Sequence, residues 1–479
     1  MTHALVWFRN DLRLADNPAL HAALRADLVP VPVYIHAPEE EGDWAPGAAS
    51  DTWRHRSLKA LAADLETRGS RLHLFRGPSL DTLRAIQAQT GARAVFWNRR
   101  YEPAIEARDT IVKRSLQHLG VQAQSHNGAL LFEPWQVETK SGDPYRVFTP
   151  FWRTALAHWR LPACTQAPAR LPAPPAIPGV LTIDALQLSP SLPWDAGFWS
   201  RWTPGEQGAH AALARFSAHA LDGYHHQRDR PDTPGTSRLS PHLHFGEIAP
   251  WRVVHHLENN PAVADRDAYL RELGWREFAH HLLHHFPHTP ETNFNPRFDD
   301  FPWMQPAPDQ LAAWQQGRTG IPIVDAGMRE LWHTGWMHNR VRMIVASLLT
   351  KNLRLHWRHG ARWFWDTLLD ASLANNSLGW QWVAGTGADA APYYRVFNPV
   401  LQAQKFDPQG DYIARWVPEL AALPPAHRHA PWTGGTPPRD YPPPIVDLAS
   451  SRQAALDALE RTRARHTASS DASDRPSPA

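Results

Sequence analysis

Short apolar runs alternate with amphipathic segments over residues 1–132. The runs are four to eight residues long and rich in Val, Ile, Leu or Phe, at residues 4–8, 29–35, 72–75 and 94–97. Between the second and third runs, residues 51–68 place Leu58, Leu61 and Leu65 at helical spacing. Alternating strands and helices predict a doubly wound parallel sheet, so we expect an α/β domain at residues 1–132. It contains neither a GxGxxG nor a GxxxxGK[ST] motif, which excludes the usual dinucleotide and P-loop fingerprints.

The pattern changes twice after this domain. Residues 133–205 include the proline-dense stretch LPAPPAIPGV, which is typical of a surface linker between domains. Residues 206–447 carry long helical periodicities and few β-branched runs, so we expect a mainly α-helical domain there. Residues 448–479 offer one short helix pattern followed by small polar residues, and we expect this tail to be largely disordered.

Composition narrows the function classes. The 479 residues include 49 basic and 47 acidic side chains, a net charge of +2, so a coat of positive charge for non-specific nucleic-acid binding is excluded. A local basic groove remains compatible with that sum. The single cysteine, Cys164, excludes intramolecular disulfides and a cysteine-held zinc or iron–sulfur site. The chain offers neither a twenty-residue apolar run nor a signal-peptide pattern, so we expect a soluble cytoplasmic protein.

Aromatic and imidazole side chains are unusually frequent, with 23 Trp and 28 His. Most buried tryptophans serve packing, but such an excess also fits an aromatic cofactor, flipped bases or electron transfer. The histidines at 280, 281, 284 and 285 form two i,i+4 pairs on an expected helix. Without an HExxH motif or other ligands nearby, we interpret them as solvated or hydrogen-bonded side chains and expect no metal site.

Two expected helices each place an unusual mixture of side chains on one face. In GWMHNRVRM, Asn339, Arg342 and Met343 stand at i, i+3 and i+4. In YLRELGWREF, Glu272, Trp275 and Arg276 have the same spacing. A carboxylate beside a tryptophan can hydrogen-bond a heterocycle that stacks on the indole, as enzymes do with extruded bases. A surface ion pair over a packed Trp is the alternative interpretation.

Two further segments suggest ligand contacts. The segment from Asp370 to residue 398 contains paired asparagines, Trp380, Trp382 and GTGADAAP, and we do not expect an amphipathic helix there. Its Gly and Asn content indicates backbone held close to a ligand. In GTSRLSPHL, Ser240 followed by Pro241 is typical of the N-cap and first residue of a helix, where hydroxyls and free N–H groups can cradle a phosphate.

Six segments, in order over most of the chain, resemble the photolyase/cryptochrome family. They are VWFRNDLRLADNPAL, YRVFTPFWR, YHHQRDRPDTPGTSRLSPHL, ELGWREF, GWMHNRVRM and DASLANN…GWQW…GADAAPYYRVFNP. Within the family, the chain is most similar to enzymes that repair cyclobutane pyrimidine dimers. The resemblance implies an N-terminal α/β domain and a helical domain that holds FAD. It also implies light-driven electron transfer from reduced FAD to a flipped-out dimer in DNA, with the protein supplying position and electrostatics.

The resemblance assigns roles residue by residue. It implies FAD contacts for Tyr224, Thr236, Ser237, Arg238, Leu239, Ser240, Arg342, Asp370, Ala371, Ser372 and Asn376. Arg342 and Asp370 match an ion pair beside the flavin ring, and Asn376 matches the amide that faces flavin N5. It implies a catalytic dimer pocket formed by Glu272, Asn339, Met343 and Asn376, together with Trp275 and Trp382.

The resemblance also implies DNA contacts and an electron route. Besides the pocket residues Glu272, Trp275, Asn339 and Trp382, the DNA-binding residues would be Arg276, Arg340, Arg395 and Gln402. The route that reduces the flavin would run through Trp380, Trp357 and Trp303.

Two departures from the family pattern bear on cofactors. Ser372 stands where many members carry a second acid, and Ala104 and Ile105 stand where folate-binding members commonly show Asn and Glu. We therefore expect no folate bound in that manner; a deazaflavin, another antenna chromophore or none stays open.

The resemblance leaves alternatives to dimer repair. One is a cryptochrome, a flavin photoreceptor without repair activity. Such photoreceptors tend to carry long C-terminal extensions and to lose pocket residues, whereas here the tail after residue 448 is short and all five pocket positions are filled. Another is repair of (6-4) photoproducts, which needs a histidine acid where this chain has Asn339 and Met343. We expect a monomeric enzyme, a deoxyribodipyrimidine photo-lyase, acting on DNA that contains pyrimidine dimers, with no membrane partner.

Overall fold

The computed structural model describes residues 2–258, 262–390, 394–433 and 438–473. The chain forms two compact units. Unit 1 comprises residues 1–225, 236–287 and 366–374, and unit 2 comprises residues 226–235, 288–365 and 375–479. Unit 1 thus spans the expected boundaries at 132 and 205, and unit 2 spans the one at 447; these boundaries stay predictions. None of the helices in the described part of the chain has the length and apolar character needed to cross a bilayer.

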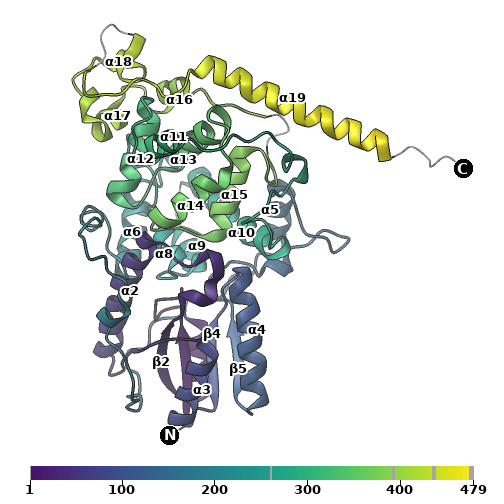
Figure 1. Cartoon of the computed structure of the whole chain (residues 1–479). Helices are drawn as coiled ribbons and strands as arrows, with labels where there is room; N and C mark the ends of the chain where they lie inside the picture. Colours follow the sequence, from purple (N-terminus) through teal and green to yellow (C-terminus); the bar gives the residue numbers. More distant parts are fainter. Residues whose placement is uncertain (1, 259–261, 391–393, 434–437, 474–479) are drawn as a thin grey trace, which may run out of the picture. The chain divides into compact units, whose positions relative to one another are not determined.

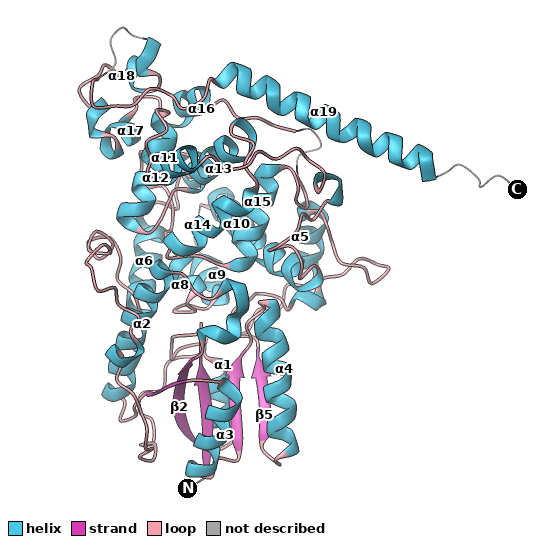
Figure 2. Cartoon of the chain, viewed as in Figure 1, coloured by secondary structure: helices cyan, strands magenta, loops and turns pink. Residues whose placement is uncertain are grey.

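Unit 1 begins with the expected α/β arrangement (Figure 1). Within the described residues, one sheet of five parallel strands has the order β3-β2-β1-β4-β5, drawn in magenta in Figure 2. The strands are β1 His3–Phe8, β2 Val29–His36, β3 His73–Arg76, β4 Ala94–Asn98 and β5 Gln122–His126. The crossover helices are α1 Pro18–Arg25, α2 Ala48–Thr67, α3 Ser79–Thr90 and α4 Pro103–His118. The expected fold class, four strands and the helix near 51–68 are confirmed.

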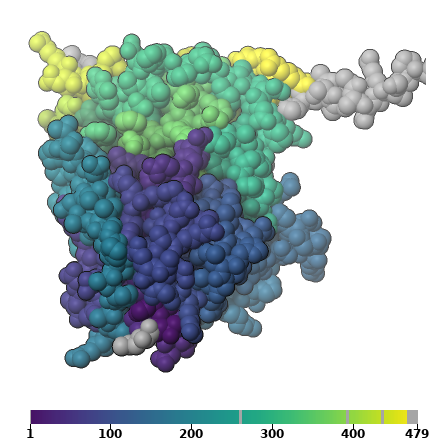
Figure 3. Space-filling model, turned by 60° about the horizontal axis from the view of Figure 1, so that its bottom comes forward, coloured from purple at the N-terminus to yellow at the C-terminus, as the bar shows by residue number. Residues whose placement is uncertain are grey.

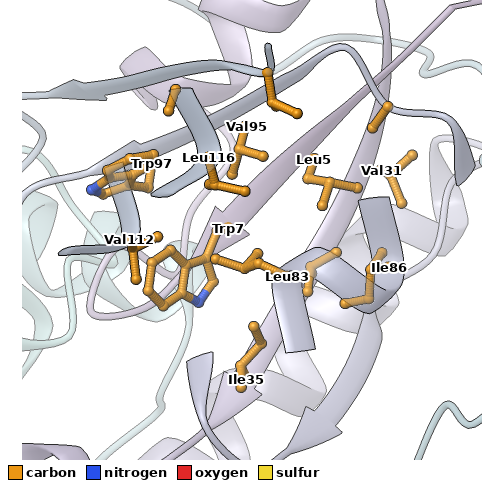
Figure 4. Packing of buried hydrophobic residues seen from close by; sticks show 14 of the residues in the cluster. Leu5, Trp7, Val31, Ile35, Leu83, Ile86, Val95, Trp97, Val112 and Leu116 are labelled. Atoms are coloured by element: carbon orange, nitrogen blue, oxygen red, sulfur yellow. The ribbon is translucent and has the colours of Figure 1, made fainter. Parts of the chain in front are cut away.

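The core of this domain follows from the two-residue period of the strands. Leu5 and Trp7 of β1 face one side of the sheet, where buried side chains of α3 and α4 meet them. Figure 4 shows Trp7 between Leu83 of α3 and Val112 of α4. Because β1 lies between two parallel neighbours and is fully covered, its sequence is a continuous apolar run. The strand ends at Phe8, and polar side chains follow from Arg9 onward.

The proline-rich linker is bound to the α/β domain along its length. The backbone N–H of Leu171 donates to the carbonyl of Arg68, and the N–H of Leu181 donates to the carbonyl of Leu74, the latter within an isolated antiparallel bridge. The Arg76 guanidinium donates to the carbonyl of Leu186. In Figure 3, blue-green atoms of residues that follow the α/β segment border its purple and blue atoms.

The remaining helices of unit 1 carry the expected site residues Tyr224, Ser240, Glu272, Trp275 and Arg276. They are α5 Phe148–Ala157, α6 Glu206–His219, α7 Tyr224–Gln227 at the unit boundary, α8 Ser240–His244, α9 Pro250–Glu258 and α10 Val263–His285. Buried carboxylates tie these helices to the α/β domain. Glu247 accepts from the indole of Trp53 and pairs with His242, and Glu277 accepts the backbone N–H groups of Leu131 and Phe132.

Unit 2 is helical, as expected for this part of the chain. Its helices are α11 Pro308–Gln315, α12 Pro322–Thr334, α13 Asn339–Ser347, most of α14 Trp357–Thr367 and α15 Leu373–Ala384, then α16 Pro399–Phe406, α17 Asp411–Trp416, α18 Pro425–Arg428 and α19 Leu448–Ser473. A single π-helical turn, Leu348–Asn352, follows α13. Short 3-10 turns join several of these elements.

One expectation for this region is confirmed and one is wrong. The segment after Asp370 forms the helix α15, which is not amphipathic, as expected, because side chains around most of its circumference are buried. The tail forms the helix α19 through Ser473, where a largely disordered segment was expected. Ala455, Ala458 and Leu459 are buried at i, i+3 and i+4, and this apolar stripe supplies the packing that holds the first half of the helix.

Candidate cofactor and DNA sites

The expected phosphate cradle lies in unit 1 beside a cluster of aromatic rings. Tyr224 is buried, with its ring centroid 5.4 Å from that of Tyr269. The Tyr269 hydroxyl donates to Oγ of Ser237 at 3.1 Å, and Oγ of Ser237 in turn accepts the backbone N–H of Leu239. Arg238 has a φ of 54°, in the left-handed region that non-glycine residues rarely adopt. The local fold therefore holds the Ser237–Leu239 turn in a fixed, unusual shape.

The cap assignment at this turn is off by one residue. Leu239 is the N-cap of α8, so Ser240 is its first residue and Pro241 the second. Helix ends commonly shift by a residue when they are assigned from sequence. The chemistry of the set still fits a diphosphate: Thr236, Ser237 and Ser240 supply hydroxyls, and Arg238 supplies a guanidinium.

The second expected cofactor segment of unit 1, residues 370–372, is buried. Asp370 and Ser372 are each 9% exposed, and Ala371 is 2% exposed. The carboxylate of Asp370 is near enough to His244 to favour the protonated imidazole, although burial dominates and lowers the pKa of His244 to about 4. His244 is therefore neutral at pH 7. The ion pair of Asp370 with Arg342, a residue of unit 2, stays a prediction.

One face of α10 presents the carboxylate and the indole that the sequence analysis singled out. Glu272 and Trp275 are partly exposed and one turn apart. The indole of Trp275 stacks on the buried ring of Phe148, with ring centroids 3.8 Å apart and ring planes 9° apart. The Phe148 ring covers one face of the Trp275 indole and thereby holds the indole plane at a fixed angle.

Arg276 differs from its neighbours on this face. Its side chain is 13% exposed and pairs with Glu277 at 3.0 Å. Burial raises the pKa of Glu277 to about 7, a larger effect than the opposing attraction of Arg276 and the two backbone N–H donors. The DNA contact expected for Arg276 stays a prediction, and it would have to compete with this buried pair.

The four histidines of α10 are hydrogen-bonded, as interpreted from the sequence. His281 and His285 both contact the carbonyl of Pro134, at 2.9 Å and 3.2 Å. His284 contacts Glu106, and His280 contacts the carbonyl of Arg276 one turn earlier. Burial lowers the pKa of His280 to about 3 and that of His281 to about 4, so these two imidazoles are neutral donors at pH 7.

In unit 2, α13 carries the expected amide, guanidinium and thioether. Asn339 is exposed at the first position of the helix, which His338 caps by accepting the N–H of Arg340. The Arg340 guanidinium pairs with Asp229 at 2.8 Å, lies 4.4 Å from the ring centroid of Phe406, and is 3.7 Å from Sδ of Met343. Nε of Arg342 donates to the carbonyl of Met337, which lies just before α13, and this hydrogen bond orients the guanidinium.

Helix α15 positions three of the expected residues. The side-chain amide of Asn376 is buried and donates to the carbonyl of Ala361 on α14. Trp380 is 3% exposed and contacts the rings of Phe364 and Trp314, at centroid distances of 5.0 Å and 6.1 Å. Trp382 is partly exposed, and its indole N–H donates to the carbonyl of Asp389. Two residues apart on a helix, the two indoles point in different directions.

The three tryptophans expected to carry electrons belong to unit 2. Trp357 begins α14, is fully buried and donates to Asn293 at 2.9 Å. Its ring contacts His356, whose ring contacts Trp303, at centroid distances of 5.4 Å and 5.1 Å. Gly360, one turn after Trp357, lies against Trp380. Trp380 therefore packs against the first turn of α14, the turn that Trp357 begins. The electron route through these two residues stays a prediction.

The remaining expected DNA contacts lie after α15. Arg395 is exposed, with its guanidinium 5.0 Å from the ring centroid of Phe397. Gln402 is half-buried on α16, which Asn398 caps by accepting the N–H groups of residues 400 and 401. Residues 391–393 of the motif GADAAPYYRVFNP lie outside the described residues.

A separate pocket lies in the α/β domain, at the carboxyl ends of β1 and β2. Its lining includes Trp7, Tyr34, His36 and Glu41, and the arginines Arg9, Arg54, Arg100 and Arg108. The guanidinium carbons of Arg9 and Arg108 lie 4.8 Å and 4.9 Å from the Trp7 ring centroid. Ligands commonly bind at this edge of a doubly wound sheet. Each of the four arginines also pairs with a carboxylate: Arg9 with Asp109, Arg54 with Asp51, Arg100 with Glu41 and Arg108 with Glu40.

Comparison with known proteins decides the family. Residues 4–175 match the family model described as DNA photolyase, and residues 269–461 match the one described as FAD binding domain of DNA photolyase. The chain is 46% identical over 470 residues to a deoxyribodipyrimidine photo-lyase of Agrobacterium fabrum, covering 95% of this chain and 97% of that protein. The chain belongs to the photolyase/cryptochrome family.

The chain is similar to both photolyases and cryptochromes. The crystal structure of a bacterial class III photolyase from Agrobacterium tumefaciens matches with a TM-score of 0.92 and 45% identity, covering 97% of this chain and 98% of that one. Cryptochrome-2 of Arabidopsis thaliana is 39% identical, covering 96% of this chain and 79% of that protein. The expected FAD-binding domain is confirmed, and the photolyase branch is supported better than the cryptochrome branch.

Sequence reasoning missed three features of this family member. Phe148 and Gly360 support Trp275 and Trp380, and only YRVFTPFWR, quoted for its resemblance, hinted at the first. The residues that line the α/β pocket were also not predicted. The sequence pattern could have indicated them, because Arg9 directly follows one buried strand and His36 ends another.

Proposed function

We propose that this chain repairs cyclobutane pyrimidine dimers in DNA by a light-driven reaction that uses FAD. The observation that carries the proposal is the α10 face, where Glu272 adjoins an indole that a buried ring holds flat. It occurs in a chain that resembles a deoxyribodipyrimidine photo-lyase over nearly its full length. When bound and reduced, FAD supplies on illumination the electron that splits the cyclobutane ring, and accepts it back afterwards.

The residues present fit FAD. In unit 1, the hydroxyls of the 236–240 turn and the guanidinium of Arg238 would hold the diphosphate, and Tyr224 would pack beside it. Asp370, Ala371 and Ser372 of the same unit, and Arg342 and Asn376 of unit 2, would hold the flavin ring. Asn376 is already oriented by its hydrogen bond to Ala361.

The protein would bind the dimer in its flipped-out form. Trp275 and Trp382 supply apolar surfaces for the extruded bases, and stacking of this kind is worth about 1–3 kcal/mol per base. Glu272 and Asn339 supply hydrogen bonds, and Met343 supplies a polarizable contact. A bond from Glu272 that strengthens as the dimer gains negative charge would favour the reacting state over the bound ground state. This requires a protonated Glu272 or a donor that Glu272 orients.

DNA itself would be bound by a small set of side chains. Arg340 and Arg395 would contact phosphates, and Gln402 and Arg276 would add polar contacts. Because the net charge is only +2, affinity would come from these local groups. A damaged pair costs less to extrude than normal bases, which are held by a few kcal/mol of stacking and pairing. The pocket, rather than the phosphate contacts, would then supply selectivity.

Two accessory roles follow from the same assignment. Trp380, Trp357 and Trp303 would reduce oxidised flavin in light. The α/β pocket lined by Trp7 and the four arginines would hold an antenna chromophore. We expect the protein to act as a monomer in the cytoplasm.

A repair assay tests the proposal. Reduced protein loaded with FAD is mixed with an oligonucleotide that contains one thymine dimer, and restored thymines are counted in light and in darkness. Repair in light alone is expected. Glu272→Ala should keep its FAD but repair fewer dimers per absorbed photon. Binding of FAD and light-driven bleaching without any repair would instead favour the cryptochrome-type photoreceptor, which the similarity to Cryptochrome-2 makes the second candidate.

A further inference from the structure

We propose that Phe148 is a positioning residue for Trp275 and thereby sets how strongly the protein prefers damaged over undamaged DNA. The proposal rests on the proposed function, in which Trp275 receives a flipped base. Phe148 belongs to α5, far from α10 in the sequence, yet its ring and the indole of Trp275 form a nearly parallel, face-to-face stack.

The geometry separates the two faces of the indole. The ring centroids of Phe148 and Trp275 are 3.8 Å apart and the planes differ by 9°, so the rings overlap face to face. Phe148 is 0% exposed, whereas Trp275 is partly exposed. The covered face of the indole therefore contacts protein, and the rest of the ring remains available to a base.

Phe148 is itself fixed from several sides. Its ring meets Phe278 edge-on at 5.8 Å and lies nearly parallel to Trp152, one turn later on α5, at 6.2 Å. Trp152 in turn packs on Gly274, where a Cβ would stand 2.6 Å from the indole. The close approach permitted by Gly274 holds α5 against α10 directly beside Trp275. Phe148 thus acts as a rigid support for the indole.

A supported indole binds a base with less loss of freedom. Without the ring of Phe148, Trp275 could rotate about its side-chain bonds into the space that the ring leaves, and binding a flipped base would have to restrict that motion. Aromatic pairs of this kind contribute an amount that corresponds to about a three- to tenfold change in an equilibrium constant. Removing the Phe148 ring should therefore weaken only those DNA complexes in which a flipped base contacts Trp275.

The test compares two buried phenylalanines of the same helix. Phe151 is 1% exposed and packs on Phe278 and His281, at centroid distances of 5.1 Å and 5.0 Å. Phe148→Leu and Phe151→Leu remove similar volumes from the same α5–α10 interface. For each FAD-loaded variant, the dissociation constants for a duplex with one thymine dimer and for the undamaged duplex are measured, along with FAD content and Tm.

The expected result is specific to one variant. Phe148→Leu should weaken binding of damaged DNA about three- to tenfold and leave binding of undamaged DNA unchanged. Phe151→Leu should lower Tm by a similar amount but keep the preference for damage. Phe148→Tyr, which keeps the ring, should also keep the preference. If Phe148→Leu does not hold FAD, Phe148→Met replaces it, because methionine fills nearly the same volume without a ring.

Other outcomes overturn one proposal or the other. Equal preferences in the Phe148 and Phe151 variants, whether both retained or both reduced, would show that Phe148 is an ordinary core residue. Trp275→Ala is measured in parallel. If that variant keeps the full preference for damaged DNA, Trp275 does not receive the lesion, and it is the proposed dimer pocket that fails.

Discussion

Gly360 of α14 and the indole of Trp380 are in such close contact that a Cβ at position 360 would stand 2.0 Å from Cη2 of the indole. Real Cβ atoms do not approach so closely, so any side chain at 360 must displace the ring. Gly360 is also one turn from Trp357, the next member of the expected electron route. The glycine therefore sets how near Trp380 can come to the helix that carries Trp357.

Gly360→Ala should displace Trp380 and slow the light-driven reduction of bound flavin. Alanine gains about 1 kcal/mol of helix propensity, but overpacking a core costs about 1–3 kcal/mol, so unfolding should become easier by up to about 2 kcal/mol. Bleaching of the oxidised FAD absorption under blue light and urea unfolding measure the two effects. Gly379→Ala on α15 is the matched control, since a Cβ there meets no atom within 4 Å. Slower bleaching in the control as well would contradict the explanation.

Trp380→Phe should keep most of the packing but remove the readily oxidised indole. Photoreduction of oxidised FAD is expected to fall at least tenfold, whereas chemically reduced protein should still repair dimers. Trp314→Phe provides a control, because Trp314 also contacts Trp380 but lies outside the expected route. Unchanged photoreduction in Trp380→Phe would show that the electron enters by another path.

Arg395→Ala should weaken binding of damaged and undamaged DNA by similar factors. The side chain is exposed, and one phosphate contact contributes roughly 0.9 to the slope of log affinity against log salt in duplex DNA. The slope should therefore fall by about one. Trp275→Ala should instead erase the preference for damage with little change in slope. Titrations at several salt concentrations distinguish the two roles, which would be reversed if the arginine variant lost the preference.

Glu277→Gln should change how stability depends on pH. Burial raises the pKa of Glu277 from 4.5 to about 7, so between these values the folded protein keeps a proton that the unfolded chain releases. Stability from this group is thus present below pH 4.5 and is lost as pH rises toward 7, by an amount on the order of 3 kcal/mol. The glutamine variant should lose that part of the slope while still accepting the N–H groups of residues 131 and 132. Urea unfolding from pH 5 to pH 7.5 measures the difference, and equal slopes would refute the assignment.

Local patterns predicted the elements whose side chains are sorted by burial. The four apolar strands and the helices carrying Glu272 and Asn339 follow from periodicity, because one buried face imposes a period of two or 3.6 residues. Strand β5 was missed, since its sequence QAQSH is polar and only Ala123 is fully buried. Helix α15 was missed for the opposite reason: burial on most sides leaves no polar face.

The sequence by itself determined the α/β and helical regions, the family and the identities of the expected site residues. Only the tertiary structure decided which distant residues support them: Phe148 under Trp275, and Gly360 against Trp380. Periodicity records which face of an element is buried, but it does not record what that face meets. Partners far apart in the chain are chosen by shape and by the desolvation of polar groups when whole helices pack together.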